Sequence, residues 1–183
     1  MSSPADSVWE RIQLTCGDIT AWHGDAIVNA ANRSLLGGKG VDGAIHRAAG
    51  PRLTDECRAI GGCMTGDAKR TGAYELPVRW VIHTVGPVWR GGGRGEEALL
   101  SRCHRRSLEL AAEVGAQTVA FPAISTGAYG YPVDEAARGA LPTVADFLSR
   151  HPIPQHVTFM LFSTAALDVW RRVLEELKQE SMP

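Results

Sequence analysis

Hydrophobic residues follow two different periods along this chain. Short apolar or alternating runs, bounded by glycine, proline and polar turn residues, predict buried strands. These runs fall at residues 12–16, 26–28, 67–71, 80–85, 118–121 and 156–162. Apolar residues at helical spacing predict helices at residues 41–49, 51–60, 96–114 and 133–150, with a last one through 167–177. Because strands alternate with helices, we expect an α/β fold in which helices cover both faces of a sheet.

Three of the longer predicted helices have a clear apolar face. The last helix places apolar residues three and four positions apart, at Leu167, Trp170, Leu174 and Leu177. The helix at 133–150 should turn inward Ala137, Leu141, Val144 and Leu148. Pro142 should bend or divide that helix. The helix at 96–114 is expected to bury Leu99, Cys103, Leu110 and Val114. Since no internal repeat or linker interrupts the pattern, we expect a single domain over residues 1–183.

Composition adds two constraints. The chain has 20 glycines in 183 residues, more than the usual share of roughly 7%, which suggests loops that turn sharply or approach a ligand closely. Its 19 Lys and Arg nearly balance 20 Asp and Glu, so it lacks the basic surface of a nucleic-acid-binding protein and any anionic ligand must be held locally. No apolar run is long enough to span a bilayer, and the first residues do not resemble a secretion signal. We therefore expect a cytoplasmic protein without a membrane partner. We also expect a monomer, because no exposed apolar helix face is evident in the sequence.

Four cysteines stand at positions 16, 57, 63 and 103, and no two of them form a C-x-x-C pair. This spacing does not favour a zinc site, and we expect no metal and no other cofactor. Reduced and mostly buried thiols are the simpler interpretation.

Ligands of open α/β sheets bind beyond the carboxyl ends of the strands. Three loops at such places are distinctive, at residues 17–20, 29–43 and 125–131. Residues 38–43 spell G-x-G-x-x-G, but the strand before them ends about eight residues too early for a dinucleotide-binding turn. A P-loop also fails, because Lys39 is followed by glycine. What remains is a glycine loop whose backbone N–H groups can cradle a phosphate, or a turn without any ligand.

Ser125 lies in A-x-S-x-G, which resembles the nucleophile elbow of serine hydrolases with alanine in the first glycine position. His151 and His156 follow as candidate bases. A serine hydrolase is nevertheless disfavoured, because no acid and histidine follow in the order that such enzymes use on the loops after later strands.

Five more polar residues are candidates for the site, and each also has a structural interpretation. Asp42, at the start of a helix, either caps that helix or serves the site. His46, one turn later on the same face, either interacts with Asp42 or is only packed. Asn29 and Asn32 stand at a strand end, where asparagine usually serves turns. His83, within an apolar strand, is better interpreted as a core residue with satisfied hydrogen bonds than as a catalyst.

Taken together and in this order, the loops resemble the macrodomain family, in its branch of ADP-ribosyl hydrolases and O-acetyl-ADP-ribose deacetylases. Five strings carry the resemblance, and they stand at residues 17–20, 27–32, 40–50, 81–87 and 121–132. They read GDIT, IVNAAN, GVDGAIHRAAG, VIHTVGP and FPAISTGAYGYP. The similarity extends over residues 11–178, which is nearly the whole chain.

The resemblance implies a three-layer α/β/α sandwich with a mixed, mostly parallel sheet, and a site for ADP-ribose. Asp18, Ile19 and Phe162 would then bind the adenine end. Two segments would enclose the diphosphate and the distal ribose. The first is Gly38, Lys39, Gly40 and Val41, and the second is Ser125, Thr126, Gly127, Ala128 and Tyr129. Asn32 would bind a hydroxyl of the distal ribose, and Asp42 would position a water beside it, with Asn29 and His46 in support.

The resemblance also implies an enzyme that removes acyl groups from ADP-ribose. Its substrates would be O-acetyl-ADP-ribose, and proteins that carry mono-ADP-ribose on Asp or Glu. The alternative is a module that binds ADP-ribose without turnover, and the presence of both Asn32 and Asp42 favours the enzyme. One position departs from the family pattern, because many relatives carry glycine where this chain has Lys39. Either that position does not need a positive φ, or Lys39 is strained there.

Overall fold

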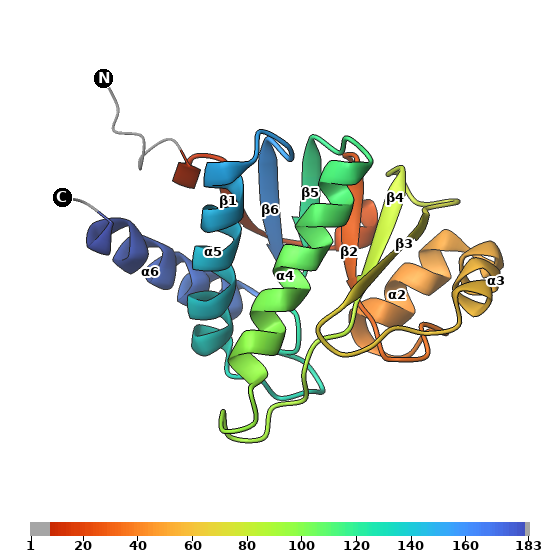
Figure 1. Ribbon diagram of the computed structural model, residues 1–183, viewed down its shortest axis with the longest axis horizontal. Coiled ribbons are helices and arrows are strands. Elements are labelled where there is room, and N and C mark those ends of the chain that lie inside the picture. Colours follow the sequence, from red (N-terminus) through yellow and green to blue (C-terminus); the bar gives the residue numbers. More distant parts are fainter. Residues whose placement is uncertain (1–7, 182–183) are drawn as a thin grey trace.

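The strands of the chain form one six-stranded sheet in the computed structural model, which describes residues 8–181 (Figure 1). They are β1 (Ile12–Cys16), β2 (Ala26–Ala30), β3 (Ala68–Gly72), β4 (Trp80–Thr84), β5 (Thr118–Phe121) and β6 (His156–Leu161). Their order across the sheet is β1-β6-β5-β2-β4-β3. Only β3 pairs antiparallel, with β4, and the other neighbours are parallel. The expected mixed, mostly parallel sheet is confirmed.

Helices cover both faces of this sheet. The elements are α2 (Gly40–Ala49) and α3 (Pro51–Ile60) on one face, and α4 (Glu96–Glu113), α5 (Val133–Arg150) and α6 (Thr164–Glu180) on the other. Figure 1 shows α4 and α5 lying across the front of the sheet. A short 3-10 helix, η1 (Ile19–Ala21), follows β1. The layers are those of the expected α/β/α sandwich. Within the part that the structure describes, no helix is long and apolar enough to cross a membrane.

The apolar runs of the central strands are explained by burial on both faces. Val28 and Ile82 pack on the side of α4, α5 and α6, whereas their neighbours Ile27 and Val81 pack on the side of α2 and α3. All four side chains are fully buried. Side chains two positions apart on a strand share a face. A polar residue at position 29 or 83 must therefore point into the layer that α2 and α3 cover.

The predicted face of α4 is partly wrong. Cys103 is buried as expected, but Leu99, Leu110 and Val114 are only half-buried. The side chains that α4 buries against the sheet include Leu100, Leu108 and Ala111. Two polar residues, His104 and Ser107, share this buried side. They interrupt the apolar pattern, so the periodicity in the sequence pointed to a neighbouring stripe of the helix.

Pro142 does not divide its helix, because α5 continues as one element from Val133 to Arg150. Proline lacks the N–H that would bond to the carbonyl four residues earlier. The loss is tolerated because the inward side chains Ala137, Leu141, Val144 and Leu148 are all buried as expected. Their packing holds both halves of the helix on the sheet.

Phe159 of β6 is a central packing residue of the layer under α4, α5 and α6. Its ring is fully buried, with its centroid 4.8 Å from Trp170 and 5.5 Å from Phe121. We expect Phe159→Ala to lower the free energy of unfolding by about 3–5 kcal/mol, measured by urea denaturation. Phe162, three residues later and 73% exposed, is the matched control, and Phe162→Ala should change it by less than about 0.5 kcal/mol. Equal effects of the two substitutions would contradict this description of the core.

Candidate functional site

A cavity of about 600 Å³ opens beyond the carboxyl ends of the parallel strands. Its walls come from the loops after β1, β2, β4, β5 and β6. The three loops that the sequence singled out all contribute to it. This is the place where ligands of open α/β sheets bind.

The cavity gathers every residue that was expected to touch the ligand. These are Asp18, Ile19, Asn32, Gly38, Lys39, Gly40, Val41, Asp42, Ser125, Thr126, Gly127, Ala128, Tyr129 and Phe162. The two residues expected in support, Asn29 and His46, are not in the wall and instead contact Asp42.

Gly86 is a wall residue that sequence reasoning missed. A Cβ at this position would stand 2.2 Å from Ser125 Oγ and 2.6 Å from Ile124, so only glycine lets the loop after β5 pack on the end of β4. The signal in the sequence was the pair Gly86-Pro87, which was interpreted only as the end of a strand. Ser125 has a φ of 67°, a strained backbone for a residue with a side chain. The loop after β5 thus makes this turn where its residues Ile124 and Ser125 pack closely on Gly86.

The two ends of the cavity have different chemistry. Gly17 N donates to Leu161 O at 3.0 Å, so Asp18 and Phe162 both follow the β1/β6 end of the sheet. Asp18 Oδ1 accepts from Thr20 Oγ1 at 2.7 Å and from Thr20 N at 2.9 Å, and both bonds lower the pKa of Asp18. Phe162 is 73% exposed beside it. One end therefore presents an ionised carboxylate and an uncovered aromatic ring, and the other end, after β2, presents Asn32 and Asp42.

Of the residues that the structure describes, only three with a charged side chain line the cavity, namely Asp18, Lys39 and Asp42. Backbone N–H groups are the remaining source of positive potential. Helix α2 begins at Gly40 with no side-chain cap, so the N–H groups of its first turn have no acceptor within the helix. Within residues 8–181, the N–H groups of Gly127, Ala128 and Tyr129 also make no hydrogen bond. Two segments of the wall thus offer free donors for an anion.

Lys39 is not strained, because its backbone is extended, with φ of −102° and ψ of 174°. The first of the two alternatives for this position is therefore correct. The neighbouring Gly38 is constrained by space. A Cβ there would stand 3.0 Å from Asp42 Oδ2 and 3.4 Å from Asn32 Nδ2. Glycine at this position lets the loop bring Asp42 and Asn32 together.

Asn32 holds its own loop. Its Oδ1 accepts from Ser34 Oγ at 2.7 Å and from Leu35 N at 3.2 Å, and its Nδ2 donates to Gly37 O at 2.9 Å. The interpretation as a turn residue is therefore correct. A carboxamide has two N–H bonds, so one of them is left for a ligand in the cavity.

Asp42 does not cap α2, because the residue in the cap position is Lys39 and no side chain caps the helix. Its carboxylate is 6% exposed, and Oδ1 accepts from Asn29 Nδ2 at 2.8 Å. His46 Nε2 lies 3.4 Å from the same oxygen. Burial raises the pKa of Asp42, whereas the Asn29 hydrogen bond and the charge of His46 oppose that rise. The result is a buried carboxylate with one oxygen held by the protein and the other beside Gly38 at the cavity.

Behind Asn29 lies His83, which is fully buried. Its Nδ1 is 3.0 Å from Asn29 Nδ2, and its Nε2 is 2.9 Å from Thr71 Oγ1. The expectation of a core histidine with satisfied hydrogen bonds is confirmed.

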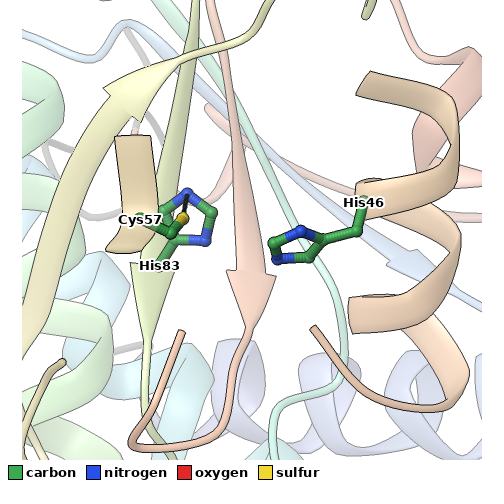
Figure 2. A group of neighbouring side chains, drawn as sticks. All are labelled: His46, Cys57 and His83. Carbon is green, nitrogen blue, oxygen red and sulfur yellow. Dashed lines mark hydrogen bonds between the residues drawn. The ribbon is translucent and has the colours of Figure 1, made fainter. Parts of the chain in front are cut away.

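Within the described residues, one group of side chains has the types that bind transition metals. His46, Cys57 and His83 place one ligand atom each within 4.8 Å of one another. Figure 2 shows His46 approaching from the side opposite Cys57, whose Sγ lies 3.8 Å from His83 Nε2. Burial raises the pKa of the Cys57 thiol to about 11, so this thiol keeps its proton. Thr54 and Thr71 bond to the two rings at 3.0 and 2.9 Å. The protein's own hydrogen bonds therefore account for the positions of both histidines.

The remaining cysteines and histidines agree with the sequence-based expectations. All four cysteines are unpaired, and only Cys16 is exposed. His156 begins β6, whose opposite end reaches the cavity, and His151 Nδ1 lies 2.9 Å from Phe147 O at the end of α5. Ser125 Oγ is buried and makes no hydrogen bond within the described part of the chain. The structure thus does not bring Ser125 and a histidine base together.

Comparison with known proteins gives one consistent family. The model of the macro domain matches residues 28–140. An O-acetyl-ADP-ribose deacetylase of Enterobacter cloacae is 51% identical over 174 residues, which cover 93% of this chain and 97% of that protein. A solved macrodomain of Oceanobacillus iheyensis with ADP has a TM-score of 0.89 at 41% identity, covering 92% of both chains. A Trypanosoma brucei macrodomain in complex with ADP-ribose has a TM-score of 0.85 at 42% identity, covering 93% of this chain and 72% of that one.

The buried charge of Asp42 should cost stability. Since its pKa is raised in the folded state, the ionised form is disfavoured there, and this cost is present above the raised pKa and disappears as the carboxyl group protonates below it. Asp42→Asn keeps an oxygen that accepts from Asn29 and removes the charge. We expect a higher Tm near neutral pH, because the substitution removes the disfavoured charge. The difference should shrink as the pH is lowered.

The matched control is Asp168→Asn, because Asp168 is exposed on α6. Its Tm should follow that of the wild type at every pH. If Asp42→Asn lowers the Tm near neutral pH, the description of Asp42 as a destabilising buried charge is wrong.

Proposed function

The chain belongs to the macrodomain family, and we propose that it binds ADP-ribose in the cavity and hydrolyses acyl esters of the distal ribose. The observation that carries the proposal is the buried Asp42 carboxylate. Asn29 holds its Oδ1, while its Oδ2 lies on the Gly38 side of the cavity wall. This is the arrangement that a water-positioning base requires.

The order of the strands gives the proposed direction of the ligand. Adenine lies at the β1/β6 end, where Asp18 accepts from its amino group, Ile19 lies near it and Phe162 packs against the ring. The diphosphate lies in the middle, and the distal ribose reaches the β2 end. There Tyr129 stacks on the sugar and the remaining N–H of Asn32 binds a hydroxyl. Support comes from the wall residues at each place and from the relatives that hold ADP and ADP-ribose.

Backbone donors hold the diphosphate in this proposal. Each N–H bonded to a phosphate oxygen is a charge-assisted hydrogen bond, worth roughly 1.5–3 kcal/mol. The first turn of α2 and the segment at 127–129 together provide several such donors. A few of them are enough to bind a diphosphate without an arginine in the wall. A chain with a net charge of −1 can therefore bind an anionic ligand.

The proposed reaction is ester hydrolysis by water. Asp42 takes a proton from the water as the water oxygen bonds to the acyl carbonyl carbon. The bond between that carbon and the ribose oxygen then breaks, and the ribose oxygen takes the proton back from Asp42 and leaves as a hydroxyl group. The raised pKa of Asp42 makes it a stronger base than an ordinary aspartate. The substrates are O-acetyl-ADP-ribose and esters that join ADP-ribose to Asp or Glu side chains of proteins.

The alternative function is binding of ADP-ribose without turnover. The burial of Asp42 favours the enzyme, because ligand binding alone gives no reason to keep an ionisable group where ionisation is disfavoured. The two functions separate when O-acetyl-ADP-ribose and a glutamate-ADP-ribosylated protein are incubated with the chain and both products are followed by mass spectrometry. Binding of ADP-ribose with no product from either substrate would establish the alternative.

Asp42→Ala tests the assigned base. We expect kcat to fall by about a hundred- to ten-thousandfold, because the water loses its proton acceptor. The calorimetric Kd for ADP-ribose should stay nearly unchanged. In the wild type, kcat should decrease at acid pH with an apparent pKa above that of an ordinary aspartate, since Asp42 must be ionised to act. Asp18→Ala is the control with the reverse pattern. It should weaken ADP-ribose binding and leave kcat, measured at saturating substrate, unchanged. Undiminished deacetylation by Asp42→Ala rules out this mechanism.

Lys39 provides a test of the phosphate-binding mode. Its side chain is exposed at the cavity wall, so any contribution to binding should be that of a screened surface charge. We expect Lys39→Gly and Lys39→Ala to weaken ADP-ribose binding by no more than about fivefold at low salt, and by less at high salt. Calorimetry at two ionic strengths measures this. A much larger loss would show that a lysine rather than the backbone holds the diphosphate, and no change at low salt excludes a phosphate role for Lys39.

A further inference from the structure

A row of buried polar side chains continues behind Asp42, across the face of the sheet under α2 and α3. Asn29 of β2 is the direct neighbour of His83 in the parallel pairing with β4. Thr71 of the adjacent β3 follows on the same face. All three side chains are buried to 1% exposure or less. Polar groups at such depth are retained where they are hydrogen-bonded.

The donor and the acceptor of each hydrogen bond in this row follow from the chemistry of Asn29. Asn29 Nδ2 can only donate, and it faces Asp42 Oδ1 at 2.8 Å and His83 Nδ1 at 3.0 Å. Nδ1 of His83 must therefore accept and carry no proton. The proton of the neutral ring is then on Nε2, which donates to Thr71 Oγ1 at 2.9 Å. Thr71 Oγ1 donates in turn to Gly72 O at 2.9 Å.

His83 is neutral near pH 7. Burial, with a smaller effect of the charge of His46, lowers the pKa of His83 to about 3. The titratable groups that face the ring are His46 of α2, with ring centroids 6.2 Å apart, and the protonated Cys57 of α3 (Figure 2). Asp42 lies beyond Asn29. The ring is therefore a permanent acceptor for Asn29.

This acceptor determines which way the Asn29 amide points. Asn29 Oδ1 is buried and has no hydrogen-bond partner within the described residues, so the two N–H bonds are what hold the amide. Without an acceptor at position 83, only the hydrogen bond to Asp42 still holds the amide. The plane of the amide can then tilt, and its N–H is no longer fixed on the carboxylate.

We propose that His83 is a positioning residue for the hydrolysis, which holds Asp42 in place by fixing the amide of Asn29. This inference rests on the proposed function. His83 itself does not line the cavity. Its effect reaches the reaction through two hydrogen bonds that Asn29 donates, one to the ring of His83 and one to Asp42.

A pair of substitutions at position 83 isolates the acceptor. His83→Leu fills the space without an acceptor, whereas His83→Asn places an amide oxygen near the position of Nδ1. We expect His83→Leu to lower kcat by about ten- to a hundredfold, the effect of a misplaced catalytic group, with KM changed by less than about threefold. Its acid limb in the pH profile of kcat should move to higher pH, because Asp42 loses the N–H that lowers its pKa. His83→Asn should recover most of the lost kcat.

His104→Leu is the matched control for the loss of a buried histidine. His104 lies on α4, on the other side of the sheet, where it is 2% exposed and stacks on Phe121 with ring centroids 5.2 Å apart. The same substitution there should lower the Tm and leave kcat and its pH profile unchanged. If it lowers kcat as much as His83→Leu does, the effect is one of general stability and the inference is wrong.

A second measurement does not depend on turnover. The carboxyl carbon of Asp42, followed by 13C NMR over pH, should report a higher pKa in His83→Leu than in the wild type and in His83→Asn. An unchanged pKa, an unchanged kcat in His83→Leu, or no recovery in His83→Asn overturns the inference. If the wild type hydrolyses none of the esters, the proposed function fails, and the NMR titration still decides whether His83 positions Asp42.

Discussion

The hydrogen bond from Asn29 to Asp42 is the interaction on which the site depends. It joins the end of a central strand to the first turn of the helix that follows, and it supports a carboxylate that is 6% exposed. An ionised group at such depth requires a partner, because the charge has lost most of its water. Asn29 supplies one without neutralising the carboxylate, so Asp42 can remain a base. His46 adds a second contact to the same oxygen, which leaves the other oxygen on the side of Gly38.

Small residues make this approach of loop and helix possible. A Cβ at position 43 would stand 2.4 Å from the carbonyl oxygen of Gly38, and a Cβ at position 38 would crowd Asp42. The surplus of glycine in the composition therefore has a structural purpose in this loop. These glycines let the backbone N–H groups and the Asp42 carboxylate lie in the same wall of the cavity. In the proposed complex, the backbone binds the anionic part of the ligand and the side chains are left for the chemistry, which agrees with a net charge of −1.

Much of the fold could be predicted because the strands are buried on both faces. Ile27 and Val28 are both apolar because they pack into the core layers on opposite faces of the sheet. Such a run is recognisable in the sequence without knowledge of the tertiary structure. The prediction from apolar runs failed at residue 29. The polar side chain there ended the apolar run, so the last two residues of β2 were not predicted as strand. It failed again on α4, because His104 is buried like an apolar residue and stacks on Phe121. Periodicity finds an element by its apolar face and misses buried polar positions.

The site was predictable as loops but not as contacts. Glycine and asparagine after the strands marked the cavity wall, and the family resemblance supplied the expected roles. Whether Asp42 caps its helix could not be decided from spacing, since the answer depends on how α2 sits over β2. The pairing of Asn29 with His83 depends on the register between β2 and β4, which are more than fifty residues apart in the sequence. No local sequence pattern shows which residues of two such strands are paired.

The central claim is that water held by Asp42 attacks the acyl carbonyl of an ADP-ribose ester. Hydrolysis of O-acetyl-ADP-ribose in 18O-labelled water, with mass spectrometry of both products, tests it most directly. We expect one 18O atom in the released acetate and none in the ribose hydroxyl that carried the acetyl group. Label in that hydroxyl would place the attack on the sugar carbon and contradict the account.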